Sequence, residues 1–196
     1  LTSPELIAAL ATTIERLTRD SGLDPLAWRL RQTDDERLRA VLRTVADHSG
    51  WAEPGRHLGM AAMQFRGSRV ATVAEVIDGA LSALWIAADV GIPLDPGILA
   101  AQMEGGMLFG LSAAVHGRIT FADGMVQQQN FPDYDAIRMS GAPVTDVRLL
   151  SSNPHIGGAG EPGTPPAAPA LANALFDLTG TRARSLPLAG QFSFVL

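Results

Sequence analysis

The sequence predicts an α+β fold in which amino-terminal helices precede mixed strands and buried helices. Residues 1–50 place apolar side chains at helical spacing. Beyond residue 56 the period changes to that of short strands separated by Asp–Gly pairs, which are typical of hairpins. Residues 165–179 are apolar nearly all round, as expected of a helix that is buried on most sides. We therefore expect a helical segment over 1–55 and a mixed part over 56–196.

The composition limits the classes of function. Only 18% of the 196 residues are charged and 46% are hydrophobic, so we expect much of the surface to be covered by something else. The net charge of −5, without a basic cluster, argues against nucleic-acid binding. The absence of cysteine excludes disulfides, iron–sulfur ligation and a thiolate nucleophile within this chain. No apolar run is expected to span a bilayer.

Three helices are expected in the first fifty residues. Ser3 can cap the first helix, which ends at Gly22. Its apolar face comprises Leu6, Ile7, Leu10, Ile14 and Leu17. Asp24 and Pro25 supply the cap and the first residue of the second helix. The third helix lies within residues 33–51, and its first turn carries the acidic residues Asp34, Asp35 and Glu36.

Strands and one long helix are expected next. The segments 58–65, 69–77 and 81–91 have the composition of strands, and Asp78–Gly79 predicts a hairpin between the last two. Asp95 and Pro96 begin a helix that stops at Gly117. Its interior contains Gly105, Gly106 and Gly110, and each glycine destabilises an exposed helix by about 1 kcal/mol relative to alanine. Such a helix is expected to approach another helix or a ligand closely.

The remaining segments are a second hairpin, an irregular segment, a strand and the buried helix. The hairpin turns at Asp123–Gly124, and residues 129–143 have no period and contain two prolines. Residues 144–152 alternate as a strand does. A glycine-rich loop follows, and Thr164 with Pro165 is expected to begin a helix that runs to Gly180.

Glu161 is the candidate catalytic residue. It is the one ionisable group in "GGAGEPGTPPAAPALANAL", residues 157–175. The glycines allow a ligand to approach the backbone, and Pro162 limits its flexibility. An apolar surround favours the protonated carboxyl, whereas a helix amino terminus favours the ionised form, and this balance suits a general base. The alternative is a structural carboxylate stabilised by backbone N–H groups at the helix entry.

Other polar residues give weaker signals. Gln102 can donate and accept hydrogen bonds at once, which suits a polar cofactor, but a surface glutamine looks the same. Tyr134 and Phe131 lie in an irregular segment of the kind that lines a cavity or an interface, although a core tyrosine is an equal alternative. The four histidines lack ligand spacing, so no metal site is expected from them. Ser112 and Ser151 have no histidine that the sequence places nearby, so a serine hydrolase is not expected.

Several segments together resemble one family. They are "DSGLDPLAWRLRQ", "AADVGIPLDPGILAAQMEGGMLFGLSAAVHGRITFADG", "QQQNFPDYDAIRM" and "GGAGEPGTPPAAPALANALFDLTGTRARSLPL". In this order they resemble the carboxyl-terminal part of the molybdopterin-binding subunit of molybdenum hydroxylases, the xanthine dehydrogenase and aldehyde oxidase superfamily. The branch that they resemble most comprises the isoquinoline 1-oxidoreductase beta subunit and bacterial aldehyde dehydrogenases. The resemblance implies that residues 56–196 form part of a molybdopterin-binding domain that is incomplete without a partner chain.

The resemblance also implies roles for single residues. Glu161 matches the active-site base beside molybdenum, and Gln102 matches the glutamine that hydrogen-bonds the pterin. Gly158, Ala159 and Gly160 would bring backbone close to the cofactor. Phe131 and Tyr134 would lie on the substrate side or at an interface between domains, and Ser151 and Ser152 near the pterin or its nucleotide tail. The implied reaction oxidises an aldehyde or an N-heteroaromatic compound with oxygen derived from water.

The resemblance finally implies cofactors and partners. Motifs that lie upstream in the family are absent here, so half of the cofactor pocket must come from a larger molybdopterin-binding chain. The implied cofactor is molybdenum–molybdopterin in its cytosine dinucleotide form, and the implied partners are a 2Fe–2S subunit and a cytochrome c subunit with haem. The expected location is the periplasm, with the cytoplasm as the alternative. The competing hypothesis is a non-catalytic structural or interaction subunit of such a complex.

Overall fold

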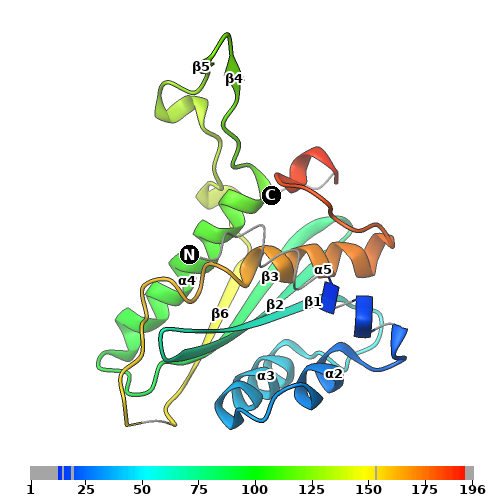
Figure 1. The fold of residues 1–196 in the computed structure, drawn as a ribbon, viewed down its shortest axis with the longest axis vertical. Helices are drawn as coiled ribbons and strands as arrows, with labels where there is room; N and C mark the ends of the chain where they lie inside the picture. Colours follow the sequence, from blue (N-terminus) through cyan, green and yellow to red (C-terminus); the bar gives the residue numbers. More distant parts are fainter. Residues whose placement is uncertain (1–12, 15, 19, 153, 193–196) are drawn as a thin grey trace.

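The centre of the fold is a mixed four-stranded sheet in the order β1-β2-β3-β6. The computed structural model describes residues 13–14, 16–18, 20–152 and 154–192 (Figure 1). Strands β1 (His57–Phe65), β2 (Ser68–Ile77) and β3 (Ala80–Asp89) form an antiparallel meander. Strand β6 (Val144–Leu150) pairs parallel with β3. The predicted strands and the predicted α+β class are confirmed.

Two helices cover one face of this sheet. Helix α2 (Pro25–Arg31) begins after Asp24, whose carboxylate accepts two backbone N–H groups, and α3 (Glu36–Ser49) begins after Asp35 in the same way. The cap predicted at Asp24 is therefore confirmed, whereas Asp35, predicted to lie in the first turn, is itself the cap of α3. One side of α3 packs on β2 and β3, where it buries Val41, Leu42, Val45 and Ala46. The predicted first helix, including Ser3, Leu6, Ile7 and Leu10, falls mainly on residues outside those that the structure describes.

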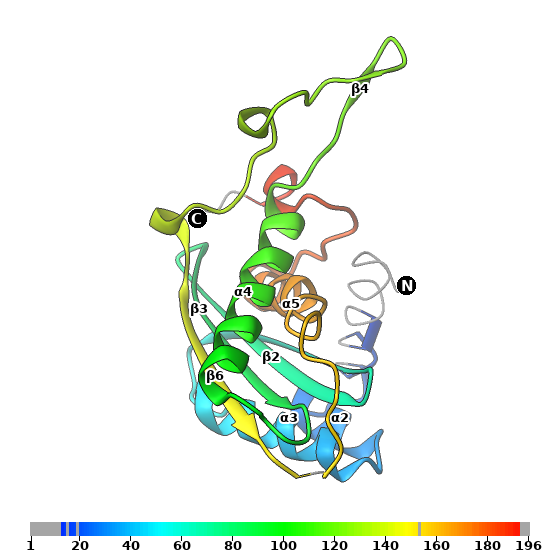
Figure 2. The same ribbon diagram turned by 90° about the vertical axis from the view of Figure 1, so that its left-hand side faces the viewer.

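Two other helices cover the opposite face (Figure 2). Helix α4 (Pro96–Val115) packs against β6 and α5, and α5 (Ala167–Thr179) packs against β1 and β2. Residues 167–175 of α5 are all buried, as the sequence predicts. A Cβ at Gly59 of β1 would lie 2.1 Å from the backbone nitrogen of Ala174, so the absence of a side chain there lets α5 rest directly on the strand.

The start of α5 corrects the sequence prediction. The helix begins at Ala167, not at Thr164 and Pro165, and no side chain caps it. A residue that precedes proline is kept out of the helical region, and this applies both to Thr164 and to Pro165. The first helical hydrogen bond therefore runs from the Ala170 N–H to the Pro166 carbonyl, at 3.1 Å. Helix α5 ends at Gly180, as predicted.

An arm leaves the body of the fold after α4 (Figures 1 and 2). It comprises residues 117–143 and contains the predicted hairpin, β4 (Phe121–Ala122) and β5 (Met125–Val126). Two short 3-10 helices follow, η1 (Phe131–Asp133) and η2 (Met139–Gly141), before the chain returns as β6. A third, η3 (Leu188–Gly190), lies near the carboxyl end. Most of the arm residues are exposed.

Helix α4 also bears on the expected absence of a bilayer span. Among the described residues it is the one helix that is long and apolar enough, by length and composition alone, to cross a membrane. Core helices of soluble proteins pass the same criterion, and eight residues of α4 are buried within the fold. The division of the chain at residue 55 stays a prediction.

Candidate functional site

The loop that carries Glu161 is tied to three other elements. The Gly157 N–H donates to the Val90 carbonyl at 2.7 Å, just beyond the end of β3. The Gly158 N–H donates to the Arg66 carbonyl at 2.9 Å, and the Ser68 hydroxyl donates to the Gly158 carbonyl at 2.6 Å. These hydrogen bonds hold the loop against the turn between β1 and β2.

The glycines of this loop serve contacts within the chain more than ligand contacts. A Cβ at Gly157 would lie 2.4 Å from the Ser68 hydroxyl, and one at Gly158 would lie 3.1 Å from the Arg66 Cβ. Both glycines therefore let the loop approach the β1–β2 turn, and the predicted approach of Gly158 to a ligand stays a prediction. Gly160 is different, because open space lies where its Cβ would be.

Gln102 joins the same loop from α4. Its side-chain amide donates to the Gly160 carbonyl at 2.8 Å, across 58 positions of sequence. Within the described part of the chain, its carbonyl oxygen makes no hydrogen bond. Because a glutamine amide has two N–H groups and one carbonyl, Gln102 can hold the loop and still bind a polar ligand. The structure thus brings Gln102, Gly160 and Glu161 together, as expected if all three serve one site.

Glu161 lies at a shallow, open hollow. The hollow is lined by Phe65, Arg66, Gly158, Gly160, Glu161 and Pro162. Glu161 itself is exposed in this chain, so the apolar surround predicted for its carboxylate is not supplied by these residues. It also lies six positions before the start of α5, so it is not part of the first turn of that helix. Its backbone carbonyl accepts the Thr164 N–H at 3.0 Å and closes a tight turn.

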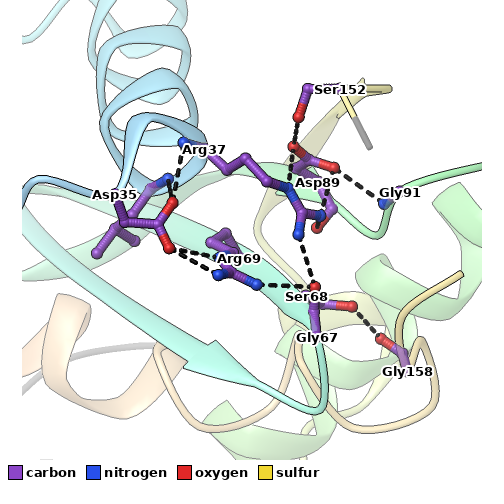
Figure 3. A network of polar contacts seen from close by, with 10 residues as sticks. Asp35, Arg37, Gly67, Ser68, Arg69, Asp89, Gly91, Ser152 and Gly158 are labelled. Carbon is purple, nitrogen blue, oxygen red and sulfur yellow. Dashed lines mark hydrogen bonds and ion pairs between the residues drawn. The ribbon is translucent and has the colours of Figure 1, made fainter. Parts of the chain in front are cut away.

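A network of charges holds the turn between β1 and β2, which borders the hollow (Figure 3). The guanidinium of Arg37 on α3 forms a bidentate pair with Asp89 at the end of β3, at 2.8 and 2.9 Å. It also donates to the Gly67 carbonyl at 2.9 Å, and Arg69 donates to the same carbonyl at 2.9 Å. Arg69 in turn pairs with Asp35 at 2.7 Å. Two arginines therefore brace the turn that carries Phe65 and Arg66.

Asp89 is the charged centre of this network. Burial raises the pKa of its carboxyl, but hydrogen bonds from Arg37, the Ser152 hydroxyl and the Gly91 N–H outweigh burial and lower the pKa to about 2. Conversely, the hydrogen bond to Asp89 raises the pKa of Arg37. The pair is therefore ionised throughout the physiological range.

Other residues singled out in the sequence lie elsewhere. Phe131 and Tyr134 are on the arm, beyond the carboxyl-terminal end of α4, whereas the Glu161 loop runs along residues 102–110 of that helix (Figure 1). This chain alone does not bring them to the hollow. Ser152 serves the Asp89 network, and Ser112 accepts the Ile137 N–H at 3.1 Å. Arg66, Phe65 and the Arg37–Asp89 pair were not predicted, although a glycine between two strands and a lone acid in an apolar strand were available signals.

About half of this chain matches a known protein family. Residues 44–143, which are 100 of the 196 residues, match the family described as molybdopterin cofactor-binding domain. The chain belongs to this family. The matched segment includes β1, β2, β3 and α4, and therefore contains both Gln102 and the turn at Arg66.

Known relatives agree with this assignment. The beta subunit of isoquinoline 1-oxidoreductase from Brevundimonas diminuta is 37% identical over 188 residues, which are 89% of this chain and 24% of that subunit. The membrane-bound aldehyde dehydrogenase of Gluconacetobacter polyoxogenes, which is named for pyrroloquinoline quinone, is 36% identical over 54% of this chain and 14% of its own length. The chain thus spans about a quarter or less of these relatives.

A solved structure shows the same fold. Quinoline 2-oxidoreductase from Pseudomonas putida 86 superposes with a TM-score of 0.54 and 19% identity, over 62% of this chain and 17% of its own. At that identity the likeness concerns the fold alone. It shows that much of the sheet and helices described above has the fold found in that oxidoreductase.

The residues around Glu161 fit the cofactor that this family binds. Gly160 leaves its Cβ position open, Gln102 keeps an acceptor oxygen unused within the described chain, and the Glu161 carboxylate is exposed at the same hollow. A pterin carries many donors and acceptors, and an amide side chain beside free peptide groups can match them. Glu161 and Gly160 line this open hollow, and Gln102 holds the loop that carries them.

Proposed function

We propose that this chain supplies the base Glu161 and part of the cofactor cradle to a molybdenum-cofactor hydroxylase. Its substrate is an aldehyde or an N-heteroaromatic compound, oxidised with oxygen derived from water, and the activity requires partner chains. The observation that carries this proposal is the hydrogen bond from Gln102 to Gly160, which fixes the residue next to Glu161 in a chain of the molybdopterin-binding family.

The residues of this chain have distinct tasks in the proposed reaction. The bound molybdenum cofactor would supply the activated oxygen and accept two electrons from the substrate carbon. Glu161 accepts a proton at a carboxylate oxygen, for which its exposed position at the hollow leaves access. Gln102 and Gly160 orient the cofactor edge, while the β1–β2 turn holds the loop in place. Partner chains close the hollow and exclude water.

The replacement Glu161→Gln in the natively purified complex tests this role. Because glutamine keeps the shape but cannot accept the proton, we expect turnover to fall by about a thousandfold. Molybdenum content and assembly should stay unchanged. Asp47→Asn removes an exposed carboxylate on α3 and serves as the matched control. Full activity of the Glu161→Gln complex would rule out the base, and a complex without molybdenum would favour the non-catalytic subunit.

The assembly and the form of the cofactor complete the proposal. We propose a larger molybdopterin-binding chain, a 2Fe–2S subunit and a cytochrome c subunit as partners, a cytosine dinucleotide form of the pterin, and a periplasmic location. The short coverage of the relatives and the low share of charged residues support partner chains. The form of the pterin and the periplasmic location are supported by the resemblance described above. Mass spectrometry of the natively isolated complex, with elemental analysis and cell fractionation, tests each of them.

A further inference from the structure

Arg66 occupies a backbone position that does not suit arginine. Three tight turns of the described chain pair a left-handed residue with a left-handed glycine: Arg66–Gly67, Asp78–Gly79 and Asp123–Gly124. The φ values of the first residues are 44°, 52° and 51°. Aspartate tolerates this conformation because its short side chain can bond locally, whereas a long side chain has no such compensation. The local backbone therefore does not explain why arginine stands at the turn beside Glu161.

The guanidinium of Arg66 also has no carboxylate partner among the described residues. It lies 5.4 Å from the centroid of the Phe65 ring and is exposed. Within the described residues it forms no hydrogen bond and no ion pair. By contrast, Arg37 on α3, Arg56 just before β1 and Arg69 on β2 are paired with carboxylates at 2.8, 2.6 and 2.7 Å.

The position of Arg66 relative to Glu161 is fixed by the backbone. Its carbonyl accepts the Gly158 N–H at 2.9 Å, three residues before Glu161, and Ser68 binds the Gly158 carbonyl. Arg37 and Arg69 hold Gly67 from below. The turn and the loop therefore form one unit, in which a free cation and an aromatic ring share a hollow with the Glu161 carboxylate.

We propose that Arg66 binds an anionic group on the substrate, so that the complex selects aromatic aldehydes or N-heteroaromatics that carry a carboxylate. This inference rests on the proposed function. A guanidinium binds carboxylate oxygens with charge-assisted hydrogen bonds, and the Phe65 ring offers an apolar face to an aromatic substrate. A phosphate of the cofactor has the same chemistry. The substrate is the assigned source because the hollow that Arg66 shares with Glu161 is where the reacting carbon must lie.

The replacement Arg66→Asn tests the proposal without endangering the fold. Asparagine tolerates a left-handed φ, so the turn should form at least as well as in the parent chain. Two matched substrate pairs are compared in the natively purified complex: benzaldehyde with 4-carboxybenzaldehyde, and isoquinoline with isoquinoline-5-carboxylate. We expect kcat/KM for the carboxylated member to fall by about 10- to 100-fold, mainly through KM, since one charge-assisted contact is lost. The uncharged member should change by less than about threefold.

Controls separate this inference from the proposed function. Arg43→Asn removes an exposed arginine of α3 and should leave both substrate ratios unchanged. Calorimetric binding of benzoate against benzamide requires no turnover, so it tests Arg66 even if the complex oxidises none of these compounds. A complex that oxidises none of these compounds would contradict the proposed function but would leave the assignment of Arg66 to be decided by the calorimetry.

Three outcomes would overturn the assignment of Arg66. Equal losses for charged and uncharged substrates would show a structural role of the turn. Loss of molybdenum and pterin from the Arg66→Asn complex would assign the anion to the cofactor. Unchanged benzoate affinity would show that Arg66 binds no substrate anion.

Discussion

At the scale of a single residue, Asp89 shows how a charged side chain can be buried at the end of a strand. Its side chain has no exposed surface, yet four polar groups meet it: the two guanidinium N–H donors of Arg37, the Ser152 hydroxyl and the Gly91 N–H. A buried carboxylate is tolerated only when it is paired and hydrogen-bonded in this way. The residue also connects α3 to the turn beneath the Glu161 hollow.

The replacement Asp89→Asn should destabilise the chain in a pH-dependent manner. At neutral pH it leaves Arg37 without its counter-ion, which costs about 3 kcal/mol. The folded-state pKa of Asp89, about 2, lies below the usual 3.8, so its stabilising effect is complete above about pH 4 and is lost as the pH falls toward 2. The shift corresponds to about 2 kcal/mol. Urea unfolding at neutral and acidic pH should therefore show that the difference in unfolding free energy between the parent chain and Asp89→Asn becomes smaller in acid.

Asp34→Asn provides the control for this measurement. Asp34 is exposed next to the cap of α3, and its replacement should change stability by less than about 0.5 kcal/mol. If the difference in unfolding free energy between the parent chain and Asp89→Asn did not change with pH, the ionised carboxylate of Asp89 would not be what stabilises the fold.

Single site residues could be predicted only where the signal is local or carried by the resemblance. Glu161 stood out because it is the lone acid in an apolar stretch, and Gln102 was found through the family motif. The contact between Gln102 and Gly160 spans 58 positions, and that between Arg37 and Asp89 spans 52. Such pairs depend on how the sheet and helices pack, which no local pattern contains. The exposure of Glu161 likewise depends on how the loop lies on the turn and on α4, which no local pattern contains.

At the scale of elements, two glycines of α4 allow the loop after Glu161 to lie close to the helix backbone. A Cβ at Gly110 would lie 2.3 Å from the Thr164 carbonyl oxygen, and one at Gly106 would lie 3.3 Å from Gly163. The loop after Glu161 therefore rests directly on α4. Gly105, in the same helix, has nothing within 4 Å of its Cβ position. The predicted close approach is thus confirmed for two of the three glycines, and the partner is the loop of this chain.

Alanine replacements in α4 should consequently have opposite effects. Gly110→Ala forces a methyl group into backbone that cannot retreat, and we expect a loss of about 2 kcal/mol or more in unfolding free energy. Gly105→Ala only gains helix propensity and should stabilise the chain by about 0.5–1 kcal/mol. Thermal and urea unfolding of the two variants measure both effects. Equal and small effects would show that the loop does not rest on α4.

Element boundaries followed from caps and periods, whereas the arrangement of the elements did not. Asp24, Asp35 and Asp95 each begin a helix, because each carboxylate accepts the free N–H groups of the first turn. The predicted start of α5 lies too early, because Pro166 disfavours a helical conformation at Pro165, the residue before it. The parallel pairing of β6 with β3 joins segments separated by α4 and the whole arm, and nothing in their periods specifies a neighbour.

At the scale of the whole molecule, the arm presents apolar side chains that this chain leaves uncovered. Phe131 is 96% exposed and Met139 is 98% exposed. Large apolar side chains that are almost fully exposed make the arm a candidate binding face. The chain spans 24% of its isoquinoline-oxidoreductase relative, so the proposed larger molybdopterin-binding chain is the expected occupant of this face.

The double replacement of Phe131 and Met139 by glutamine should therefore weaken assembly without weakening the fold. Large apolar side chains at the centre of an interface carry much of its affinity, so we expect recovery of the larger chain in co-purification to fall by about tenfold or more. The melting temperature of the separate chain should stay within a few degrees, since neither side chain is buried in it. Ile77→Gln removes an exposed apolar side chain at the β2–β3 turn and serves as the control. Undiminished recovery of the larger chain would show that the arm is not the assembly surface.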